Sequence, residues 1–234
     1  MRRATAIAAV GLALALGACG GDDRPAAPAA EPASPPSAVP VRFSATDGEP
    51  VEGTFRPAGD AAPAVILVNG LVGGPDQWDA FAPALHDAGF ASLAYEGRGG
   101  VDVTGLAREV AGAVAFLRTR EDVDPRRLGI VGSSVGASAA VLAMTGPDGR
   151  RLRAAVALSP RAESVLDAVA RRAYHPRNVL FVSDQREAPT VERLVRGAAG
   201  SRLVVTEAVG HGVAQLESAA QRDVVLDWLA EHLR

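Results

Sequence analysis

The sequence predicts one α/β domain in which a mostly parallel central sheet is flanked by helices. Two observations support this prediction. Between about Val41 and Arg234, short and nearly all-apolar segments alternate with segments whose apolar residues recur at the helical period. The chain has 234 residues, which is enough for one sizeable domain and argues against two large ones.

An antiparallel hairpin is expected first, because the extended segments Val41–Thr46 and Val51–Arg56 are joined through Asp47-Gly48. Buried strands should follow, since several short segments carry hardly any polar residue. They are expected at Ala64–Val68, Ala91–Tyr95, Leu128–Val131, Ala154–Leu158, Val179–Val182 and Leu203–Thr206.

Helices are expected between and after these strands. Pro75 and Pro189 lie where proline suits a helix start, and Gly89 and Gly200 lie where glycine suits a helix end. The expected helices are Asp76–Ala88, Thr104–Arg120, Val135–Thr145, Ser164–Arg171, Thr190–Ala199 and Val213–Leu233.

Charge and cysteine content exclude several classes of function. The formal net charge is −3 and 4% of the residues are aromatic, so the chain lacks the basic surface expected of a nucleic-acid-binding protein. A single cysteine excludes an intramolecular disulfide and a Cys-rich metal site. The four histidines are not spaced as metal ligands, so no metal site is expected.

Residues 1–18 have the pattern of a targeting segment that is removed from the mature protein. A basic start is followed by the apolar run Ala4–Leu16, which is too short for a bilayer that takes about 20 residues to cross. Leu16-Gly17-Ala18-Cys19 resembles the lipobox of bacterial lipoprotein signal peptides, in which the cysteine is lipidated and becomes the mature N-terminus. The resemblance implies export and lipid anchoring to the bacterial cell envelope through Cys19. The alternative is a plain secretory signal with an incidental cysteine.

Residues 19–40 are expected to form a disordered tether. The segment is rich in Pro and Ala and has hardly any large apolar side chain, so it cannot bury enough surface to fold. The folded domain is therefore expected at residues 41–234, with the tether lifting it off the membrane.

A candidate nucleophile lies in Gly132-Ser133-Ser134-Val135-Gly136, directly after the expected strand Leu128–Val131 and before an expected helix. This is Gly-x-Ser-x-Gly at a strand-to-helix turn, which is so sharp that the residues two before and two after the serine must be small. The turn should present the Ser134 hydroxyl beside helix N–H groups that favour negative charge. Ser133 is interpreted as a bystander. A chance match in a chain with 25 glycines is the alternative.

A serine hydroxyl needs a base to become nucleophilic, so the hypothesis requires a histidine later in the chain. His211 is the candidate because it follows the last expected strand and lies between Gly210 and Gly212. A carboxylate is then expected after the strand Val179–Val182, to hold the imidazole in the right tautomer. Asp184 and Glu187 both follow that strand, and only one of them can fill the role.

From Ala61 to the C-terminus these residues resemble the α/β-hydrolase superfamily, in which serine, acid and histidine follow in this order. The resemblance implies the α/β-hydrolase fold. The acid of the family usually comes three residues after a glycine that ends its strand. That pattern puts Asp184 at the glycine position and implies Glu187 as the acid, with Asp184 as the alternative.

Two backbone N–H donors are needed for the oxyanion of the intermediate. Val135, directly after the nucleophile, supplies one. The resemblance implies Leu71 as the other, in the Gly-rich loop Asn69–Gly74, where Asn69 replaces the histidine that the family often has. No Lys-Ser/Thr pair follows this loop, so nucleotide binding is not expected.

Tyr95–Gly100 resembles the Asp-x-Arg-Gly-x-Gly loop of many members, and Arg98 is expected to tie neighbouring loops together. About 18 residues separate the strand ending near Ser159 from the one starting near Asn178, which leaves room for one helix and no lid domain. This compact form is similar to the dienelactone-hydrolase and small carboxylesterase branches, although dienelactone hydrolases carry cysteine in place of Ser134.

We therefore expect an envelope-anchored serine hydrolase that cleaves carboxylic ester or thioester bonds of a small molecule through an acyl-enzyme, without a cofactor. The same triad also serves peptidases, lipases and acyltransferases. The alternative from another class is a catalytically silent lipoprotein that uses this fold to bind a ligand or an envelope partner.

Overall fold

The computed structural model of the chain describes residues 38–169, 174–207 and 210–234. The predicted signal peptide, Cys19 and the predicted tether up to residue 37 lie outside these residues.

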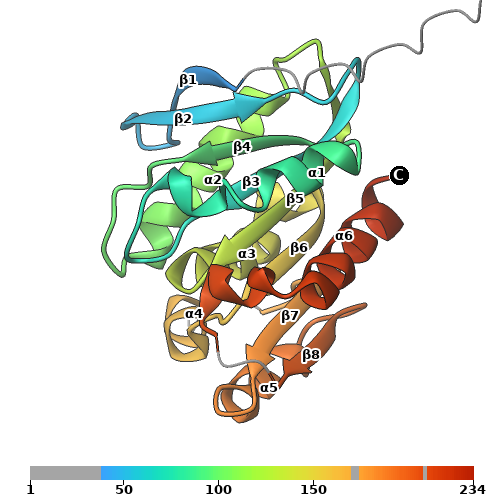
Figure 1. Cartoon of the computed structure of the whole chain (residues 1–234). Helices are drawn as coiled ribbons and strands as arrows, with labels where there is room; N and C mark the ends of the chain where they lie inside the picture. Colours follow the sequence, from blue (N-terminus) through green and yellow to red (C-terminus); the bar gives the residue numbers. More distant parts are fainter. Residues whose placement is uncertain (1–37, 170–173, 208–209) are drawn as a thin grey trace, which may run out of the picture. The chain divides into compact units, whose positions relative to one another are not determined.

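The described strands form one mostly parallel sheet, as the sequence predicts (Figure 1). They are β1 (Val39–Ser44), β2 (Pro50–Arg56), β3 (Ala62–Val68), β4 (Ala91–Tyr95), β5 (Val123–Ser133), β6 (Leu152–Leu158), β7 (Val179–Asp184) and β8 (Arg202–Thr206). Their order in the sheet is β1-β2-β4-β3-β5-β6-β7-β8. The predicted β1–β2 hairpin is antiparallel, β2 pairs antiparallel with β4, and the remaining neighbours pair in parallel.

Helices connect the strands and cover both faces of the sheet (Figure 1). The α-helices are α1 (Ala82–Asp87), α2 (Val103–Leu117), α3 (Val135–Thr145), α4 (Ala162–Val169), α5 (Ala188–Val195) and α6 (Ala219–Leu233). The 3₁₀ segments are η1 (Pro75–Trp78), η2 (Pro147–Arg150) and η3 (Gly212–Glu217). Helices α2 to α5 pack on one face, whereas α1 and α6, with η1 and η3, pack on the other.

Each central strand contributes side chains to both hydrophobic layers. In β3, Ile66 and Val68 pack in the layer under α2 to α5, and Val65 and Leu67 pack in the layer under α1 and α6. Successive side chains of a strand point to opposite faces, so a strand covered on both sides has to be apolar throughout. This is the reason that β3 appears in the sequence as an unbroken apolar segment, and all of its residues are buried.

Two of the expected helices are each divided in the structure. The expected helix Asp76–Ala88 is η1 followed by α1, because Pro83 belongs in the first turn of a helix and not in its interior. The expected helix Val213–Leu233 is η3 followed by α6, and the two are separated at Ser218, whose ψ of 125° is extended. The second break gives the residues after His211 a short segment of their own.

Some element boundaries also differ from the prediction. β1 starts at Val39, two residues earlier than expected, so the last residues of the predicted tether belong to the sheet. β5 is longer than expected and runs to Ser133, the residue before the candidate nucleophile. The helix predicted to end at Ala199 already ends at Val195.

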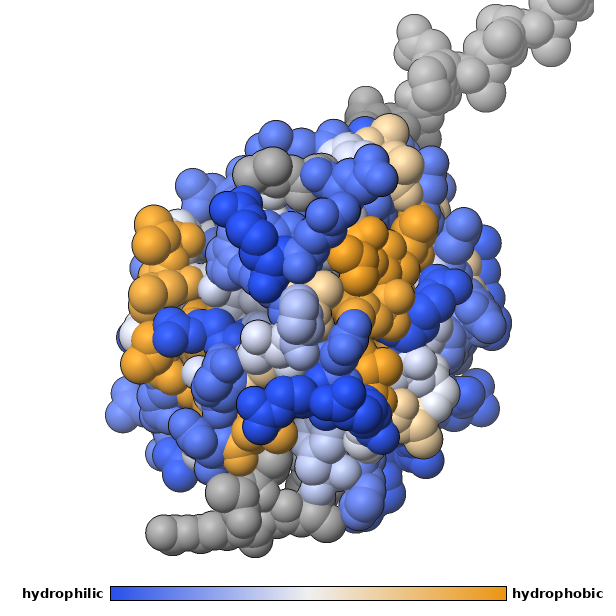
Figure 2. All heavy atoms as spheres, turned by 90° about the horizontal axis from the view of Figure 1, so that it is seen from below, coloured by the Kyte–Doolittle hydropathy of each residue, from blue (hydrophilic) through white to orange (hydrophobic). Residues whose placement is uncertain are grey.

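β8 forms one edge of the sheet, and its Val205 is 46% exposed. Figure 2 views the molecule from below, the end that carries β8 and α5 in Figure 1, and shows mainly hydrophilic residues with the hydrophobic ones in separate groups.

Within residues 38–169, 174–207 and 210–234, no helix combines the length and the apolar character needed to cross a bilayer.

Candidate active site

Ser134 lies at the turn between β5 and α3, at the carboxyl end of the sheet. Its φ of 54° and ψ of −113° are strained for a residue with a side chain, as expected for a sharp strand-to-helix turn. Gly132 and Gly136 make the turn possible. A Cβ atom on Gly132 would lie 2.3 Å from the carbonyl oxygen of Gly136, and one on Gly136 would lie 2.4 Å from that of Val68.

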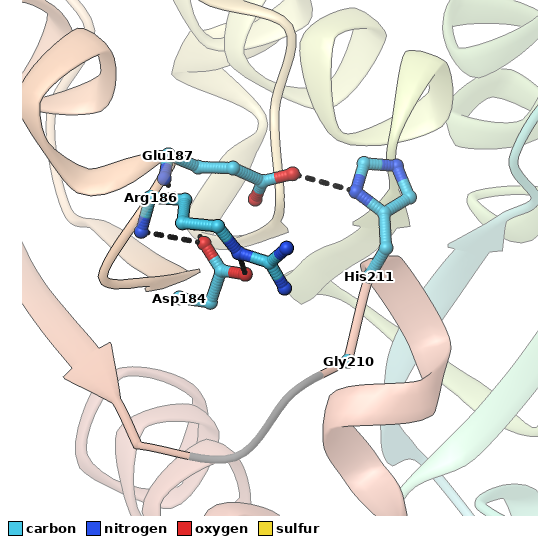
Figure 3. A pocket seen from close by; sticks show the side chains of 5 residues that line it. All are labelled: Asp184, Arg186, Glu187, Gly210 and His211. Carbon is cyan, nitrogen blue, oxygen red and sulfur yellow. Dashed lines mark hydrogen bonds and ion pairs between the residues drawn. The ribbon is translucent and has the colours of Figure 1, made fainter.

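Three side chains from separate segments form a continuous hydrogen-bonded chain. Nε2 of His211 lies 2.8 Å from Oγ of Ser134, and Nδ1 of His211 lies 2.7 Å from Oε1 of Glu187. Figure 3 shows the side chain of Glu187, which comes from the loop after β7, extending towards the imidazole of His211. The carboxylate fixes the tautomer: Nδ1 carries the proton that it donates to Glu187, so Nε2 is free to accept the hydroxyl proton of Ser134.

Asp184, the alternative acid of the sequence analysis, has a different set of partners. Its Oδ1 accepts hydrogen bonds from the backbone N–H groups of Arg186, at 2.9 Å, and Glu187, at 3.0 Å, and its Oδ2 accepts one from Nε of Arg186. The hydrogen bond from Glu187 N–H is the largest cause of a lowered pKa for Asp184. Asp184 therefore shapes the loop that presents Glu187 (Figure 3).

The loop that carries His211 is fixed on both sides by hydrogen bonds. After His211, the backbone N–H of Val213 donates to Oγ of Ser133 at 3.0 Å. Before His211, Nε2 of Gln215 donates to the carbonyl oxygen of Gly210 at 3.3 Å and to Oγ of Ser159 at 3.0 Å. The interpretation of Ser133 as a bystander is therefore wrong, because its hydroxyl holds the loop of the histidine.

Sequence reasoning missed these loop contacts for a physical reason. Ser133 and Ser159 end or follow neighbouring parallel strands, and Gln215 lies in η3, so only the folded sheet brings them together. The one available signal was the polar Ser133 beside the nucleophile. Gly212 fits the same contact: its φ is +61°, and a Cβ atom there would lie 2.2 Å from Oγ of Ser133.

The two expected oxyanion donors belong to segments that meet at Ser134. A Cβ atom on Gly70 would lie 3.5 Å from Cβ of Ser134, so the loop that holds Leu71 comes close to Ser134 at the residue before Leu71. In the described part of the chain neither Leu71 N–H nor Val135 N–H donates a hydrogen bond, whereas Gly70 N–H donates to Oε1 of Gln77 at 3.3 Å. An oxyanion needs two such unengaged donors, and these two N–H groups belong to segments that meet at Ser134.

The side chain of Asn69 hydrogen-bonds within this loop. Asn69, where the family often has histidine, donates from Nδ2 to the carbonyl oxygen of Gly73 at 3.0 Å.

Arg98 ties the neighbouring loops together as expected: it donates to Asp47 in the β1–β2 turn, at 2.8 Å and 3.1 Å, and to buried Glu109 of α2, at 2.7 Å. The hydrogen bonds from Arg98 lower the pKa of Asp47 to about 2.

The site opens to solvent. The side chain of His211 is 56% exposed, and that of Glu187 is 33% exposed. A hollow of about 370 Å³ adjoins Asp184, Glu187 and His211 (Figure 3), and another of about 250 Å³ extends from His211 past Arg161. Nowhere in residues 38–169, 174–207 and 210–234 do three or more His, Cys, Asp or Glu side chains come together as metal ligands.

Comparison with known protein sequences gives a partial match. No known family model matches the chain. Over 114 residues, 45% of the chain, it is 34% identical to two uncharacterized proteins of Mycobacterium tuberculosis, Rv2307c and MT2364. The match spans 41% of the length of each of these relatives.

Solved structures resemble the chain over most of its length. A dienelactone hydrolase from Anabaena variabilis matches 86% of this chain and 100% of its own, with a TM-score of 0.73 and 19% identity. The Pyrococcus furiosus esterase Pf2001 matches 85% and 94%, with a TM-score of 0.68 and 17% identity. Est1E from Butyrivibrio proteoclasticus matches 82% and 99%, with a TM-score of 0.63 and 16% identity. The chain thus has the fold of the α/β hydrolases.

Proposed function

We propose that this chain is a serine hydrolase that cleaves carboxylic ester or thioester bonds through an acyl-enzyme intermediate. The observation that carries the proposal is the hydrogen-bonded chain from Ser134 through His211 to Glu187. Two unengaged N–H groups, on Val135 and in the loop that comes close to Ser134, support it, as do structural neighbours that bear the names dienelactone hydrolase and esterase.

In the first half of the reaction, His211 Nε2 takes the proton of Ser134 Oγ as that oxygen attacks the carbonyl carbon of the substrate. Leu71 N–H and Val135 N–H donate hydrogen bonds to the carbonyl oxygen, which becomes negatively charged. Glu187 stabilises the imidazolium that forms. The imidazolium then gives its proton to the departing alkoxide or thiolate, and the acyl group stays on Ser134.

Water releases the acyl group in the second half. His211 Nε2 accepts a proton from a water molecule while the oxygen of that water attacks the acyl carbon. The N–H groups of Leu71 and Val135 stabilise the second oxyanion. Collapse of this intermediate breaks the bond to Ser134, whose Oγ takes the proton back from His211. The exposed His211 gives water direct access to the acyl-enzyme.

Covalent labelling tests the mechanism without knowledge of the substrate. The full chain, solubilised in detergent, is treated with a fluorophosphonate and examined by intact mass, beside Ser134→Ala and His211→Ala. We expect one label per chain, lost in both variants, because only an activated serine reacts. If the folded chain stays unlabelled, the proposal is wrong and a ligand-binding module becomes the better description.

We also propose that a lipid on Cys19 anchors the hydrolase to the bacterial cell envelope. The basic start, the short apolar run and Leu16-Gly17-Ala18-Cys19 support this proposal. Cell fractionation of the full chain and of Cys19→Ala tests it: the chain should sediment with membranes and the variant should not. Equal membrane association of both would contradict the lipid anchor.

A further inference from the structure

We propose that Arg161 makes the enzyme selective for esters that carry a negatively charged group, which binds in the hollow between Arg161 and His211. The inference rests on the proposed hydrolase function. Arg161 lies between β6 and α4, and it lines the hollow of about 250 Å³ together with His211 and Glu187. We call this space the Arg161 hollow.

The backbone of Arg161 is held close to the nucleophile. Its N–H donates to Oγ of Ser138 at 2.9 Å, and its carbonyl oxygen accepts from the same hydroxyl at 3.3 Å. Ser138 is buried in α3, and its own N–H donates to the carbonyl oxygen of Ser134 at 3.1 Å. One buried residue thus connects Arg161 with the residue that carries the nucleophilic hydroxyl.

The Arg161 hollow adjoins the triad at His211. A group bound in this hollow contacts His211, whose Nε2 lies 2.8 Å from Oγ of Ser134. The hollow is therefore within reach of a substrate that Ser134 attacks. A charged substituent several bonds from the reacting carbonyl suits this arrangement, because the hollow begins at His211 and extends past it to Arg161.

The charge of Arg161 is available to a ligand. Its side chain is exposed, and its guanidinium forms no hydrogen bond or ion pair with the described residues. Arg186, which also lines the hollow, instead donates to Asp184 (Figure 3). A guanidinium matches the geometry of carboxylate and phosphate groups and donates charge-assisted hydrogen bonds to them.

Two acidic side chains also line the Arg161 hollow, and they differ in their partners. Glu187 is engaged with His211, and the imidazolium that forms during the reaction balances its charge. Glu163 is exposed and forms no ion pair with Arg161, so it should oppose the binding of an anion. The start of α4 at Ala162 favours negative charge, as Arg161 does. Removal of Arg161 and removal of Glu163 should therefore have opposite effects.

Two matched pairs of esters test the inference on the full chain, solubilised in detergent. In the first pair the charge lies in the acyl half of the ester: mono-4-nitrophenyl adipate is compared with 4-nitrophenyl hexanoate. In the second pair it lies in the alcohol half: 4-acetoxybenzoate is compared with its methyl ester. We expect a higher kcat/KM for the anionic member of at least one pair, and that pair identifies the half of the substrate that occupies the hollow.

Substitutions connect the preference with Arg161. Arg161→Gln should lower kcat/KM for the preferred anionic ester about 3- to 5-fold, the size expected of an exposed ion pair, and leave that for the neutral ester unchanged. The change should lie in KM, because the contact is the same in the ground state and the transition state. Arg161→Lys should retain most of the preference, and Glu163→Gln should increase it. Added salt should weaken the preference of the native chain, since ions screen exposed charges.

The matched control is Arg118→Gln. Arg118 is an exposed arginine at the end of α2 and lines neither hollow beside His211, so the variant should keep the native preference. A preference that Arg161→Gln retains, or that Arg118→Gln loses to the same extent, would overturn the inference, because a group other than Arg161 would then select the charge.

Covalent labelling separates this inference from the proposed function. If a native chain that is labelled at Ser134 shows equal kcat/KM within both pairs, or does not turn over the anionic esters, the role of Arg161 is refuted and the hydrolase proposal stands. Absence of labelling at Ser134 in the folded chain would refute the hydrolase proposal itself.

Discussion

The hydroxyl of Ser133 accepts a hydrogen bond from the backbone N–H of Val213, across the space between the end of β5 and the loop of His211. The same two segments contain the nucleophile and its base, each one or two residues away. This hydrogen bond thus helps to hold Ser134 and His211 at a fixed separation, through atoms that take no part in the proposed reaction. Gln215, which donates to the Gly210 carbonyl, supports the loop from the other side.

Removal of the Ser133 hydroxyl should loosen this arrangement without loss of the fold. We expect Ser133→Ala to lower kcat about 10- to 100-fold, because small displacements of a catalytic base have effects of this size. KM should change little, since Ser133 does not face the substrate hollows. Steady-state kinetics with p-nitrophenyl acetate measure both constants.

A matched control is Ser183→Ala, which removes a buried hydroxyl that has no hydrogen-bond partner among the described residues. It should retain the native kcat. If Ser133→Ala retains the native kcat, Ser133 is not a positioning residue. The same conclusion follows if kcat falls only together with the melting temperature, because the loss of activity would then reflect a weaker fold.

Glu187 and Asp184 differ in their contacts, and substitution by the matching amide separates their roles. Glu187→Gln should lower kcat about 10³- to 10⁴-fold, because a neutral amide neither enforces the tautomer of His211 nor stabilises its cation. Asp184→Asn should have a small effect, since its side-chain oxygen can still accept the N–H groups of Arg186 and Glu187. Turnover of a short acyl ester measures both variants, and the opposite ranking would transfer the role of acid to Asp184.

The sharp turn at Ser134 predicts a reversal of an ordinary stability rule. A glycine within a helix usually makes the protein less stable than an alanine at the same position, by about 0.5–1 kcal/mol. Gly136 lies in α3, but a Cβ atom there would come within 2.4 Å of backbone oxygens of Val68 and Asn69. Gly136→Ala should therefore lower the free energy of unfolding by about 1–3 kcal/mol or more. Urea unfolding tests this against Gly146→Ala, whose nearest contact would be 3.7 Å, and equal stability of the two variants would contradict the packing argument.

Asp47 should make stability depend on pH. Its pKa is about 2 in the folded chain because of Arg98, and about 3.9 is usual in an unfolded one. A lowered folded-state pKa adds stability above the unfolded value, and this stability is lost as the pH falls through the folded value. Asp47→Asn should therefore be less stable than the native chain at pH 7, and the gap should narrow between about pH 4 and pH 2.

Denaturant unfolding at several pH values measures this gap. The control is Asp60→Asn, which removes an exposed carboxylate that forms no ion pair with the described residues and should change the free energy of unfolding little at pH 7. A gap for Asp47→Asn that is the same at every pH would show that its charge does not stabilise the fold.

The sequence by itself determined the sheet and the candidate nucleophile. The buried strand β3 is apolar on both faces, because its neighbouring residues alternate between the two hydrophobic layers, and it can therefore be recognised in the sequence as an unbroken apolar segment. The nucleophile could be found because its turn places strict demands on Gly132 and Gly136, which lie within two residues of Ser134. Requirements that act between chain neighbours are readable from the chain.

Tertiary structure decided the partners of these residues. Asp184 and Glu187 are both acids in one short loop, and only the folded position of His211 distinguishes the carboxylate that contacts the imidazole. Ser133 and its partner Val213 are 80 positions apart in the sequence. Gln215 and its partner Ser159 are 56 positions apart. A hydrogen bond requires a donor–acceptor distance of about 3 Å and a suitable direction. For residues this far apart in the sequence, the packing of strands and loops sets the distance and the direction, so a local sequence pattern cannot predict the bond.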